Sequence, residues 1–377
     1  MRVGLDLLYL VPGQTGGRET YARELVPAML ERSPELELVA FVNRDAGPQL
    51  AAELGGRVRA VVLPVSARSR AQWSLGELAL VSLAARRAGV ELVHAMANFG
   101  PPWGAFRRVL TIHDLQYKAV PDLFSRPLHA ATSALVSLAS RRADRIIAVS
   151  AAGREEIVAG LGIEPARIDV VPNGVRPAPV GAEVSGMRER LGAGERPVAL
   201  TVATNLAHKN LPVLFDALAL IAPHERPLLA LAGHGTDDAG LRARARAAGV
   251  DEDVRLLGGL STGELDALYA SAALLVLPSL HEGFGLPVLE AMARSVPVAC
   301  SDIGALREVG GEAAIYFDPR SARQIAAAIA RLLTDRDLAG RLREQGPARA
   351  AGFSWSAAAT ATLASYARTL GGRAPAP

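Results

Sequence analysis

Short runs of hydrophobic residues alternate with segments of helical spacing along most of the chain. In the first half the hydrophobic runs are VGLDLLYLV, ELVAFV, VRAVVL, ELVHAM, RRVLTI, DRIIAVS and IDVVP. Apolar residues recur at helical spacing between these runs, as in residues 21–30. Buried runs of this length separated by helices are typical of βαβ units and a parallel sheet. We therefore predict a doubly wound α/β domain here.

The alternation breaks once and then starts again. Residues 173–197 are rich in Gly and Pro, which predicts an interdomain linker with one short helix. The strands resume as PVALTVA, PLLALAG, VRLLGG, ALLVLPS, VPVACSD and AAIYFDP, and Ser261 with Glu264 predicts a capping box. We predict two doubly wound domains, residues 1–175 and 176–352. Residues 353–377 are predicted to form a helix that packs back toward the first domain, followed by a tail.

The composition excludes several classes of protein. Of the 377 residues, 50% are hydrophobic and 21% charged, which excludes a disordered tail or a coiled coil. The single cysteine, Cys300, excludes a disulfide framework and fits a reducing, cytoplasmic compartment. Residues 350–367, the longest stretch without a charged residue or histidine, contain too much Gly, Ser and Thr for a membrane span. The N-terminus is predicted to be a strand, with no signal peptide.

The charge balance argues against a nucleic-acid partner. The pI is about 9.3 but the formal excess is only +3, and it falls in residues 1–175. Of the 41 basic residues only Lys118 and Lys209 are lysines. A lysine kept in a chain that otherwise uses arginine suggests a site that needs a compact ammonium group.

Two loops of the first half follow predicted strands, where parallel sheets bind ligands. Gly16 and Gly17 precede a helix whose first amides could contact a phosphate; a flexible turn is the alternative. The spacing is not G-x-G-x-x-G, which disfavours a dinucleotide cofactor and a dehydrogenase. His113 follows the RRVLTI strand and could bond a substrate hydroxyl or donate to an anion near neutral pH. An isolated His-Asp pair is more often structural, and His94 and Asn98, which follow the preceding strand, are weaker candidates.

In the second half, Lys209 follows the PVALTVA strand, at or just before the start of a helix. A cation there opposes the helix dipole unless an anion lies between them, as a diphosphate would; a solvated surface lysine is the alternative. After the ALLVLPS strand, Glu282 lies on a loop and Glu290 one turn inside the next helix, with Pro287 in its first turn. The amides of residues 283–288 could receive phosphate oxygens.

These segments resemble the retaining glycosyltransferases of family 4, which have the GT-B fold of two Rossmann-like domains. Glu282 and Glu290 resemble the E-x7-E motif of that family. Similar segments follow the family's order along nearly the whole chain: GGRETYARELV, TIHDLQYKAVPDLFSRP, ADRIIAVSAAGREEIV, IDVVPNGV, SDIGALREVGGEAAIYFDP and the FSW at residues 353–355.

The resemblance implies roles for individual residues. His113, Lys209 and Glu282 would be catalytic, with Lys209 neutralising the diphosphate, while Glu290 would accept hydrogen bonds from the ribose. The implied donor-binding residues are Gly16, Gly17, Thr204, His208, Lys209, Glu282, Gly283, Phe284, Gly285, Leu286 and Glu290. The implied acceptor-binding residues are Arg18, Asn98 and Asp114.

The resemblance also implies the reaction. A hexosyl unit, with mannosyl or glucosyl favoured, would pass from a GDP- or UDP-linked sugar to a hydroxyl of a glycan, lipid-linked or small-molecule acceptor. The acceptor would attack from the side of the leaving group, so the anomeric configuration would be retained. No cofactor and no metal is expected, because leaving-group stabilisation by Lys209 and backbone amides suffices and no acidic cluster suits magnesium.

One departure, two alternatives and one further expectation accompany this hypothesis. Many family members carry an arginine beside the lysine, where this chain has Thr204 and His208, so Arg18 or a protonated His208 would have to help. A nucleotide-sugar epimerase or a non-catalytic nucleotide-sugar sensor would share the donor site. Peripheral membrane contact is plausible for a lipid-linked acceptor, and the predicted basic patches are Arg68 with Arg70, Arg86–Arg87, Arg107–Arg108 and Arg141–Arg142 with Arg145.

Overall fold

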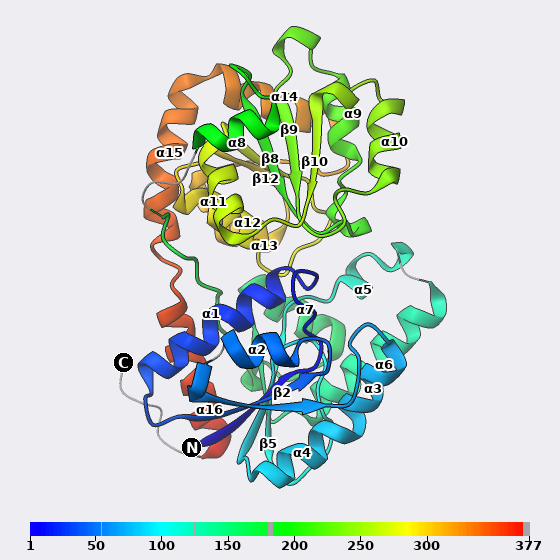
Figure 1. Ribbon diagram of the computed structural model, residues 1–377, viewed down its shortest axis with the longest axis vertical. Coiled ribbons are helices and arrows are strands. Elements are labelled where there is room, and N and C mark those ends of the chain that lie inside the picture. Colours follow the sequence, from blue (N-terminus) through cyan, green and yellow to red (C-terminus); the bar gives the residue numbers. More distant parts are fainter. Residues whose placement is uncertain (54, 124, 180–183, 372–377) are drawn as a thin grey trace. The chain divides into compact units, whose positions relative to one another are not determined.

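The computed structural model describes residues 1–53, 55–123, 125–179 and 184–371. The chain forms two compact units. Unit 1 holds Met1–Gly174 together with the chain from Ser354 onward, and unit 2 holds Val175–Phe353. Each unit contains one parallel sheet with helices packed on it (Figure 1).

The sheet of unit 1 has seven parallel strands in the order β3-β2-β1-β4-β5-β6-β7. All seven predicted strands of the first half are confirmed. Their bounds are β1 Arg2–Leu7, β2 Glu37–Asn43, β3 Val58–Leu63, β4 Leu92–Ala95, β5 Arg107–Ile112, β6 Arg145–Ala148 and β7 Ile168–Val170.

The helices of unit 1 connect these strands and cover the sheet. They are α1 Gly17–Arg32, α2 Gly47–Glu53, α3 Arg70–Leu75, α4 Val81–Ala88, α5 Gln116–Ala119, α6 Arg126–Arg142, α7 Ala151–Leu161 and α16 Trp355–Leu370. Residues 76–80 form a π-helical turn that joins α3 to α4. Since βαβ crossovers are right-handed, α1 and α2 lie on one face of the sheet, and α6 and α7 lie on the other.

Helix α16 packs against α1, β5 and β6. It therefore covers the part of the α1 face that the crossover helices leave open. Buried hydrogen bonds fix it there: Tyr366 bonds His94 Nδ1 on β4 at 2.6 Å, and its hydroxyl also contacts Met29 Sδ on α1. Arg368 pairs with Asp169 of β7 at 2.9 Å. The last helix is thus an integral part of unit 1.

The sheet of unit 2 has six parallel strands in the order β10-β9-β8-β11-β12-β13, which confirms all six strands predicted for the second half. The strands are β8 Val198–Val202, β9 Leu228–Ala232, β10 Val254–Gly258, β11 Leu274–Leu277, β12 Val298–Ser301 and β13 Ala314–Phe317. The helices are α8 Val184–Leu191, α9 Val213–Ala219, α10 Ala239–Ala247, α11 Thr262–Ser271, α12 Leu286–Ala293, α13 Gly304–Gly310, α14 Ala322–Thr334 and α15 Arg336–Ala350. The predicted Ser261–Glu264 capping box at the start of α11 is confirmed.

Two details differ from the sequence-based expectation. The first hydrophobic run is not a strand throughout, because β1 ends at Leu7 and the buried Asn43 amide donates to the carbonyls of Leu8 and Leu10, which holds them in a turn. The segment 173–197 contains the predicted short helix, α8, which is confirmed, but this helix is part of unit 2, where it packs on α11 and buries Met187. Among the described residues, no helix has the length and apolar character needed to cross a bilayer.

Candidate functional site

The strand order of each sheet reverses at one point. In unit 2 the reversal lies between β8 and β11. These strands are neighbours in the sheet, although 71 residues of the chain lie between the end of β8 and the start of β11. Ligands of open α/β sheets bind beyond the carboxyl ends of the strands at such a point. The loop after β8 carries Lys209, and the loop after β11 carries Glu282. The two loops singled out by the sequence are therefore brought to the same place.

Lys209 and Glu282 form a close ion pair. The Lys209 Nζ atom donates to Glu282 Oε1 at 2.7 Å, and the Ser279 hydroxyl donates to the same oxygen at 2.7 Å. The side chains are largely buried, with exposed fractions of 18% for Lys209 and 9% for Glu282. An ammonium group has three N–H donors, so this bond leaves Lys209 two further donors for a ligand.

The environment keeps Glu282 ionised. Burial by itself disfavours the charged carboxylate, but the positive charge of Lys209 and the hydrogen bonds from Lys209 and Ser279 outweigh it. The charge of His208 acts in the same direction, so the pKa of Glu282 lies below its usual value. The pair is therefore a charged one at neutral pH.

The helix-dipole reason given for Lys209 is wrong in this structure. Lys209 ends a 3₁₀ turn, Ala207–Lys209, and α9 begins only at Val213. Asn210 lies between Lys209 and α9 in the left-handed conformation, with φ 54°. Its side-chain amide donates to the carbonyl of Pro319 at 2.8 Å. The anion beside Lys209 is instead the carboxylate of Glu282. Thr204 opens the same loop, and the carbonyl of His208 accepts the amide of Leu280 at 2.7 Å, which ties the two loops together.

The loop after Glu282 leads directly into α12. Gly285 precedes the helix with φ 110°, and a side chain there would overlap Leu306, so only glycine fits. Pro287 lies in the first turn, as expected. The amide of Val288 donates to the carbonyl of Gly285 at 3.0 Å, which corrects the expectation that the amides through residue 288 could all receive a phosphate. Phe284 packs edge-on against Phe353, with ring centroids 5.8 Å apart.

Glu290 lies one turn inside α12 and faces a different environment from that of Glu282. Burial raises its pKa above the usual value, although a hydrogen bond and nearby arginines, Arg294 and Arg176, partly offset the effect. The Tyr269 hydroxyl on α11 donates to Glu290 Oε2 at 2.7 Å. Arg294 stacks over the Tyr269 ring at 5.2 Å and pairs with Asp266 of α11, so four side chains lock α11 to α12.

In unit 1 the reversal of strand order lies between β1 and β4, and the glycine loop follows β1. Helix α1 begins at Gly17, and Gly16 precedes it with φ 55° and no side-chain cap. Glu19 shapes this loop, because its Oε2 atom accepts the amide of Gly13 at 2.8 Å and the hydroxyl of Thr15 at 3.4 Å. Arg23 holds the other carboxylate oxygen of Glu19 at 2.9 Å.

His113 lies just beyond β5 and is neutral. Its Nε2 atom lies 2.9 Å from the carbonyl of Met96, and since a carbonyl can only accept, Nε2 carries the proton. Burial lowers the pKa of His113 to about 4, with the nearby charge of Arg18 acting in the same direction. The expectation that His113 donates to an anion near neutral pH is therefore wrong: the remaining ring nitrogen, Nδ1, can only accept a hydrogen bond, as from a hydroxyl.

Asn98 and Asp114 orient the segment around His113. The amide of His113 donates to Asn98 Oδ1 at 2.7 Å, and the Asn98 side chain donates to the carbonyl of Asp114 at 2.9 Å.

His94 is a core residue and not a ligand-binding one. Both of its ring nitrogens are hydrogen-bonded, one to Tyr366 and one to Thr111, and burial lowers its pKa to about 3. Arg18 lies over the ring of Tyr9, 5.7 Å from its centroid, and its charge acts on His113.

Two side chains at these sites were missed by the sequence analysis. Ser279 precedes the E-x7-E segment and bonds its first glutamate, and Tyr269 comes from a separate helix to bond the second. Serine three residues before Glu282 is a spacing that could have been noticed. Nothing in the sequence spacing connects Tyr269 with Glu290, because their contact depends on how α11 and α12 pack.

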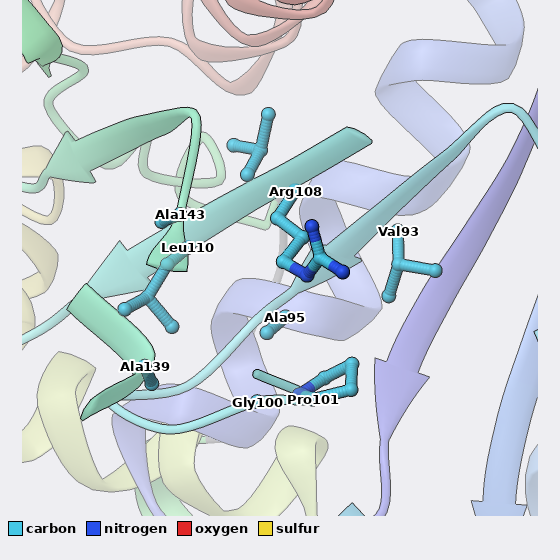
Figure 2. A pocket seen from close by; sticks show the side chains of 9 residues that line it. Val93, Ala95, Gly100, Pro101, Arg108, Leu110, Ala139 and Ala143 are labelled. Carbon is cyan, nitrogen blue, oxygen red and sulfur yellow. The ribbon is translucent and has the colours of Figure 1, made fainter. Parts of the chain in front are cut away.

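The described residues contain no group of three or more His, Cys, Asp or Glu side chains placed to hold a metal ion. Figure 2 shows a pocket of unit 1 between β4, β5 and α6, with Arg108 among mainly apolar side chains. It contains none of the predicted site residues.

Comparison with known families identifies the chain. Residues 15–178 match the family described as Glycosyltransferase Family 4, and residues 186–349 match Glycosyl transferases group 1. The O-antigen chain mannosyltransferase B of Escherichia coli is 31% identical over 283 residues, which are 71% of this chain and 72% of that protein. The chain belongs to glycosyltransferase family 4.

Other glycosyltransferases are similar over smaller shares of this chain and of their own length. A glycogen synthase of Mycobacterium tuberculosis is 34% identical over 68% of this chain and 61% of its own length. The MMP alpha-(1->4)-mannosyltransferase of Mycolicibacterium hassiacum is 29% identical over 61% of this chain and 56% of its own length.

Solved structures show the same GT-B fold. Sucrose-phosphate synthase of Thermosynechococcus elongatus covers 98% of this chain and 99% of its own, with a TM-score of 0.81 and 21% identity. The Anabaena protein HepE, solved with UDP and glucose, covers 94% of this chain and 96% of its own, with a TM-score of 0.75 and 21% identity. This glycosyltransferase therefore has two Rossmann-like domains of the GT-B type.

Proposed function

We propose that this glycosyltransferase is a retaining hexosyltransferase that uses a GDP- or UDP-linked sugar, with a mannosyl or glucosyl donor favoured. The acceptor is a hydroxyl of a glycan, a lipid-linked sugar or a small molecule, in polysaccharide or glycoconjugate biosynthesis. The observation that carries the proposal is the Lys209–Glu282 ion pair at the strand-order reversal of unit 2, with Glu290 on the adjoining helix. Relatives named as mannosyltransferase and glycogen synthase support hexosyl transfer.

The chemistry of the leaving group explains why this pair is needed. Cleavage of the anomeric C–O bond leaves positive charge on the sugar ring and negative charge on the departing diphosphate. An enzyme accelerates this step by stabilising the charge that develops in the transition state. Lys209 retains two N–H donors for the β-phosphate, and the uncapped start of α12 adds the positive end of a helix. Glu282, ionised and fixed by Ser279, holds the ammonium in place and faces the transferred sugar.

His113 contributes through its one open ring nitrogen. With Nε2–H donated to Met96, the neutral Nδ1 accepts a hydrogen bond from a donor-sugar hydroxyl. This role does not depend on pH above about 5, because the pKa of His113 is about 4. Asn98 and Asp114 set the orientation of this histidine, and Arg18 adds positive charge near the glycine loop.

The proposed course of the reaction is front-side attack. The acceptor hydroxyl approaches from the side of the leaving group, and the departing phosphate takes its proton, so the new glycosidic bond keeps the anomeric configuration. We propose that no metal takes part, since Lys209 and backbone amides supply the positive charge; activity retained in excess EDTA tests this point.

A donor panel tests the proposed function. The protein is incubated with UDP- and GDP-linked glucose, mannose and N-acetylglucosamine, with and without simple glycoside acceptors, and released nucleoside diphosphate is measured. We expect slow hydrolysis of one donor and a rise with a suitable acceptor, with the product anomer defined by NMR. Complete absence of release with a donor that binds would favour the sensor hypothesis, and an isomerised nucleotide sugar would favour the epimerase.

A further inference from the structure

Tyr21 of α1 lies directly beside His113 in the interior of unit 1. It is fully buried, and its ring meets the His113 ring edge-on, with centroids 4.8 Å apart and planes at 88°. The hydrogen bond from Nε2 to the Met96 carbonyl fixes one atom of the His113 ring. The edge-on contact fixes the plane of the ring, because aromatic pairs favour this geometry. The direction in which His113 Nδ1 points therefore depends on Tyr21.

A chain of buried hydrogen bonds connects the Tyr21 hydroxyl to the last helix. The hydroxyl lies 3.0 Å from the Thr111 hydroxyl on β5, which lies 2.7 Å from His94 Nε2 on β4. His94 Nδ1 lies 2.6 Å from the hydroxyl of Tyr366 on α16. All four side chains are fully buried. Four elements far apart in the sequence thus meet in one chain of hydrogen bonds.

The protons along this chain have a single order. The Tyr366 hydroxyl donates to Met29 Sδ, so its proton is not available to His94. His94 is neutral, since burial lowers its pKa to about 3, and it must carry its one ring proton on Nδ1 to donate to the Tyr366 oxygen. Its Nε2 atom then accepts the proton of Thr111, and the Thr111 oxygen accepts the proton of Tyr21.

The last helix also reaches Tyr21 through its first residue. Trp355 begins α16 and is buried, and its ring centroid lies 6.2 Å from that of Tyr21. The chain before the linker packs closely here, because a side chain at Gly174 would overlap the backbone of Trp355. Tyr21 is therefore held by Trp355 at its ring and by the hydrogen bonds from Tyr366 at its hydroxyl.

We propose that Tyr21 is the positioning residue of His113 and that α16 holds Tyr21 from these two sides. Tyr21 is buried and acts only through His113, by fixing the direction in which Nδ1 meets a sugar hydroxyl. The last helix therefore acts on the site as well as on the core. The inference rests on the proposed role of His113 in the reaction, but its first tests need no substrate.

Histidine NMR of the wild-type protein tests the proton order. Long-range proton–nitrogen spectra distinguish a neutral ring protonated on Nδ1 from one protonated on Nε2. We expect the proton of His94 on Nδ1 and that of His113 on Nε2, with neither ring protonated above about pH 5. The charge of Arg18 opposes protonation of His113 and that of Asp114 favours it, but burial dominates. A proton on Nε2 of His94 would contradict the proposed chain.

Three substitutions separate positioning from stability. Tyr21→Leu removes the ring beside His113, so we expect a mixture of His113 tautomers and a pKa that rises toward its usual value as the ring gains solvent. Tyr21→Phe keeps the ring and should keep the single tautomer. Phe41→Leu, the matched control, removes a fully buried ring of β2 that packs with residues of α4, and should lower only the stability. Loss of stability in Tyr21→Leu with an unchanged tautomer and pKa of His113 would overturn the proposal.

Tyr366→Phe tests the connection to α16. It removes the oxygen that accepts the Nδ1 proton of His94, so that proton should move to Nε2 and donate to Thr111. The hydrogen bond between Thr111 and Tyr21 then reverses. A His94 proton that stays on Nδ1 in this variant would contradict the assignment of α16.

Turnover with the donor identified in the panel completes the test. Tyr21→Leu should lower kcat about tenfold and leave the Kd of the nucleoside diphosphate unchanged, because His113 meets the sugar and not the nucleotide. Tyr21→Phe should restore most of the lost turnover. Normal kcat in Tyr21→Leu despite a changed His113 tautomer would reject the proposed role of His113 in the reaction, whereas the effect of Tyr21 on His113 would stand.

Discussion

Glu282 and Glu290 belong to one sequence motif, yet their carboxylates lie in opposite electrostatic surroundings. Glu282 is bonded by an ammonium and a serine hydroxyl, and its pKa is lowered despite burial. Glu290 is bonded by a tyrosine hydroxyl, with arginines only nearby, and burial raises its pKa. The comparison shows that residue type and spacing identify the pair, whereas the side chains contributed by other elements decide what each carboxylate can do. We infer that Glu282 fixes a cation and that Glu290 acts as a hydrogen-bond acceptor.

The largest expected effect is at the cation. The variant Lys209→Met removes the charge that fixes Glu282 and that meets the leaving group, so we predict a fall in kcat of about 100-fold or more. The matched control is Lys118→Met, which removes the chain's other lysine, an exposed one on α5. Steady-state release of nucleoside diphosphate measures both. Near-normal turnover in Lys209→Met would contradict the assignment.

Replacing each glutamate by the neutral glutamine separates the role of Glu282 from that of Glu290. Glu282→Gln should lower kcat about 10- to 100-fold while UDP or GDP binds as tightly as before, because the ammonium group of Lys209 remains available to the phosphate.

Glu290→Gln should instead weaken nucleotide binding by about tenfold, the usual cost of a hydrogen bond to a charged group, with a smaller effect on kcat at saturation. Calorimetric titration with the nucleoside diphosphate distinguishes the two variants. The same loss of binding in both would show that the two carboxylates share one role.

A smaller effect is expected at Tyr269. Tyr269→Phe removes the hydroxyl that bonds Glu290 Oε2 and lowers its pKa, so the pKa of Glu290 should rise further. We predict that the nucleotide binds about threefold to tenfold more weakly. In a plot of nucleotide affinity against pH, the acid limb, where affinity is lost as Glu290 is protonated, should move to higher pH. Tyr316→Phe, which removes a hydroxyl bonded to the carbonyl of Gly311 in the same unit, is the matched control and should leave both unchanged. An unmoved acid limb in Tyr269→Phe would assign the tyrosine a purely structural role.

A second pair of carboxyl groups extends the comparison to a site where no positive charge contributes to the pKa of either group. Asp6 on β1 and Glu77 on the π-helical turn are buried and influence each other's titration, and both pKa values are raised, chiefly by burial. The Asp6 Oδ2 and Glu77 Oε2 atoms are buried and have no hydrogen-bond donor among the described residues, so we infer that the two groups share a proton.

The smallest expected effect concerns this pair and is a change in how the stability of the protein depends on pH. Raised pKa values mean that unfolding releases a proton, so the stabilisation is complete below the usual carboxyl range and is lost as the pH rises through the raised values. The melting temperature should therefore fall as the pH rises above the usual carboxyl range, and Glu77→Gln, which needs no shared proton, should reduce the slope. An unchanged slope in that variant would show that the pair does not carry the effect.

The sequence predicted the elements better than it predicted the contacts among their side chains. The strands could be predicted because parallel, buried strands appear as apolar runs, and the loops that follow them hold Lys209 and Glu282. The ion pair itself could not, because it depends on β8 and β11 being neighbours, which periodicity does not reveal. The proton position on His113 also depends on a carbonyl 17 residues away, at Met96. Tyr269 and the Asp6–Glu77 pair likewise arise from packing between elements.

The central claim is that a nucleoside diphosphate binds where the loop of Lys209 meets the Glu282–Glu290 segment. A crystal structure of the wild-type protein with UDP or GDP tests it most directly. We predict a phosphate oxygen within hydrogen-bond distance of Lys209 Nζ and a ribose hydroxyl on Glu290. A nucleotide bound elsewhere, with Lys209 still paired only to Glu282, would contradict the account.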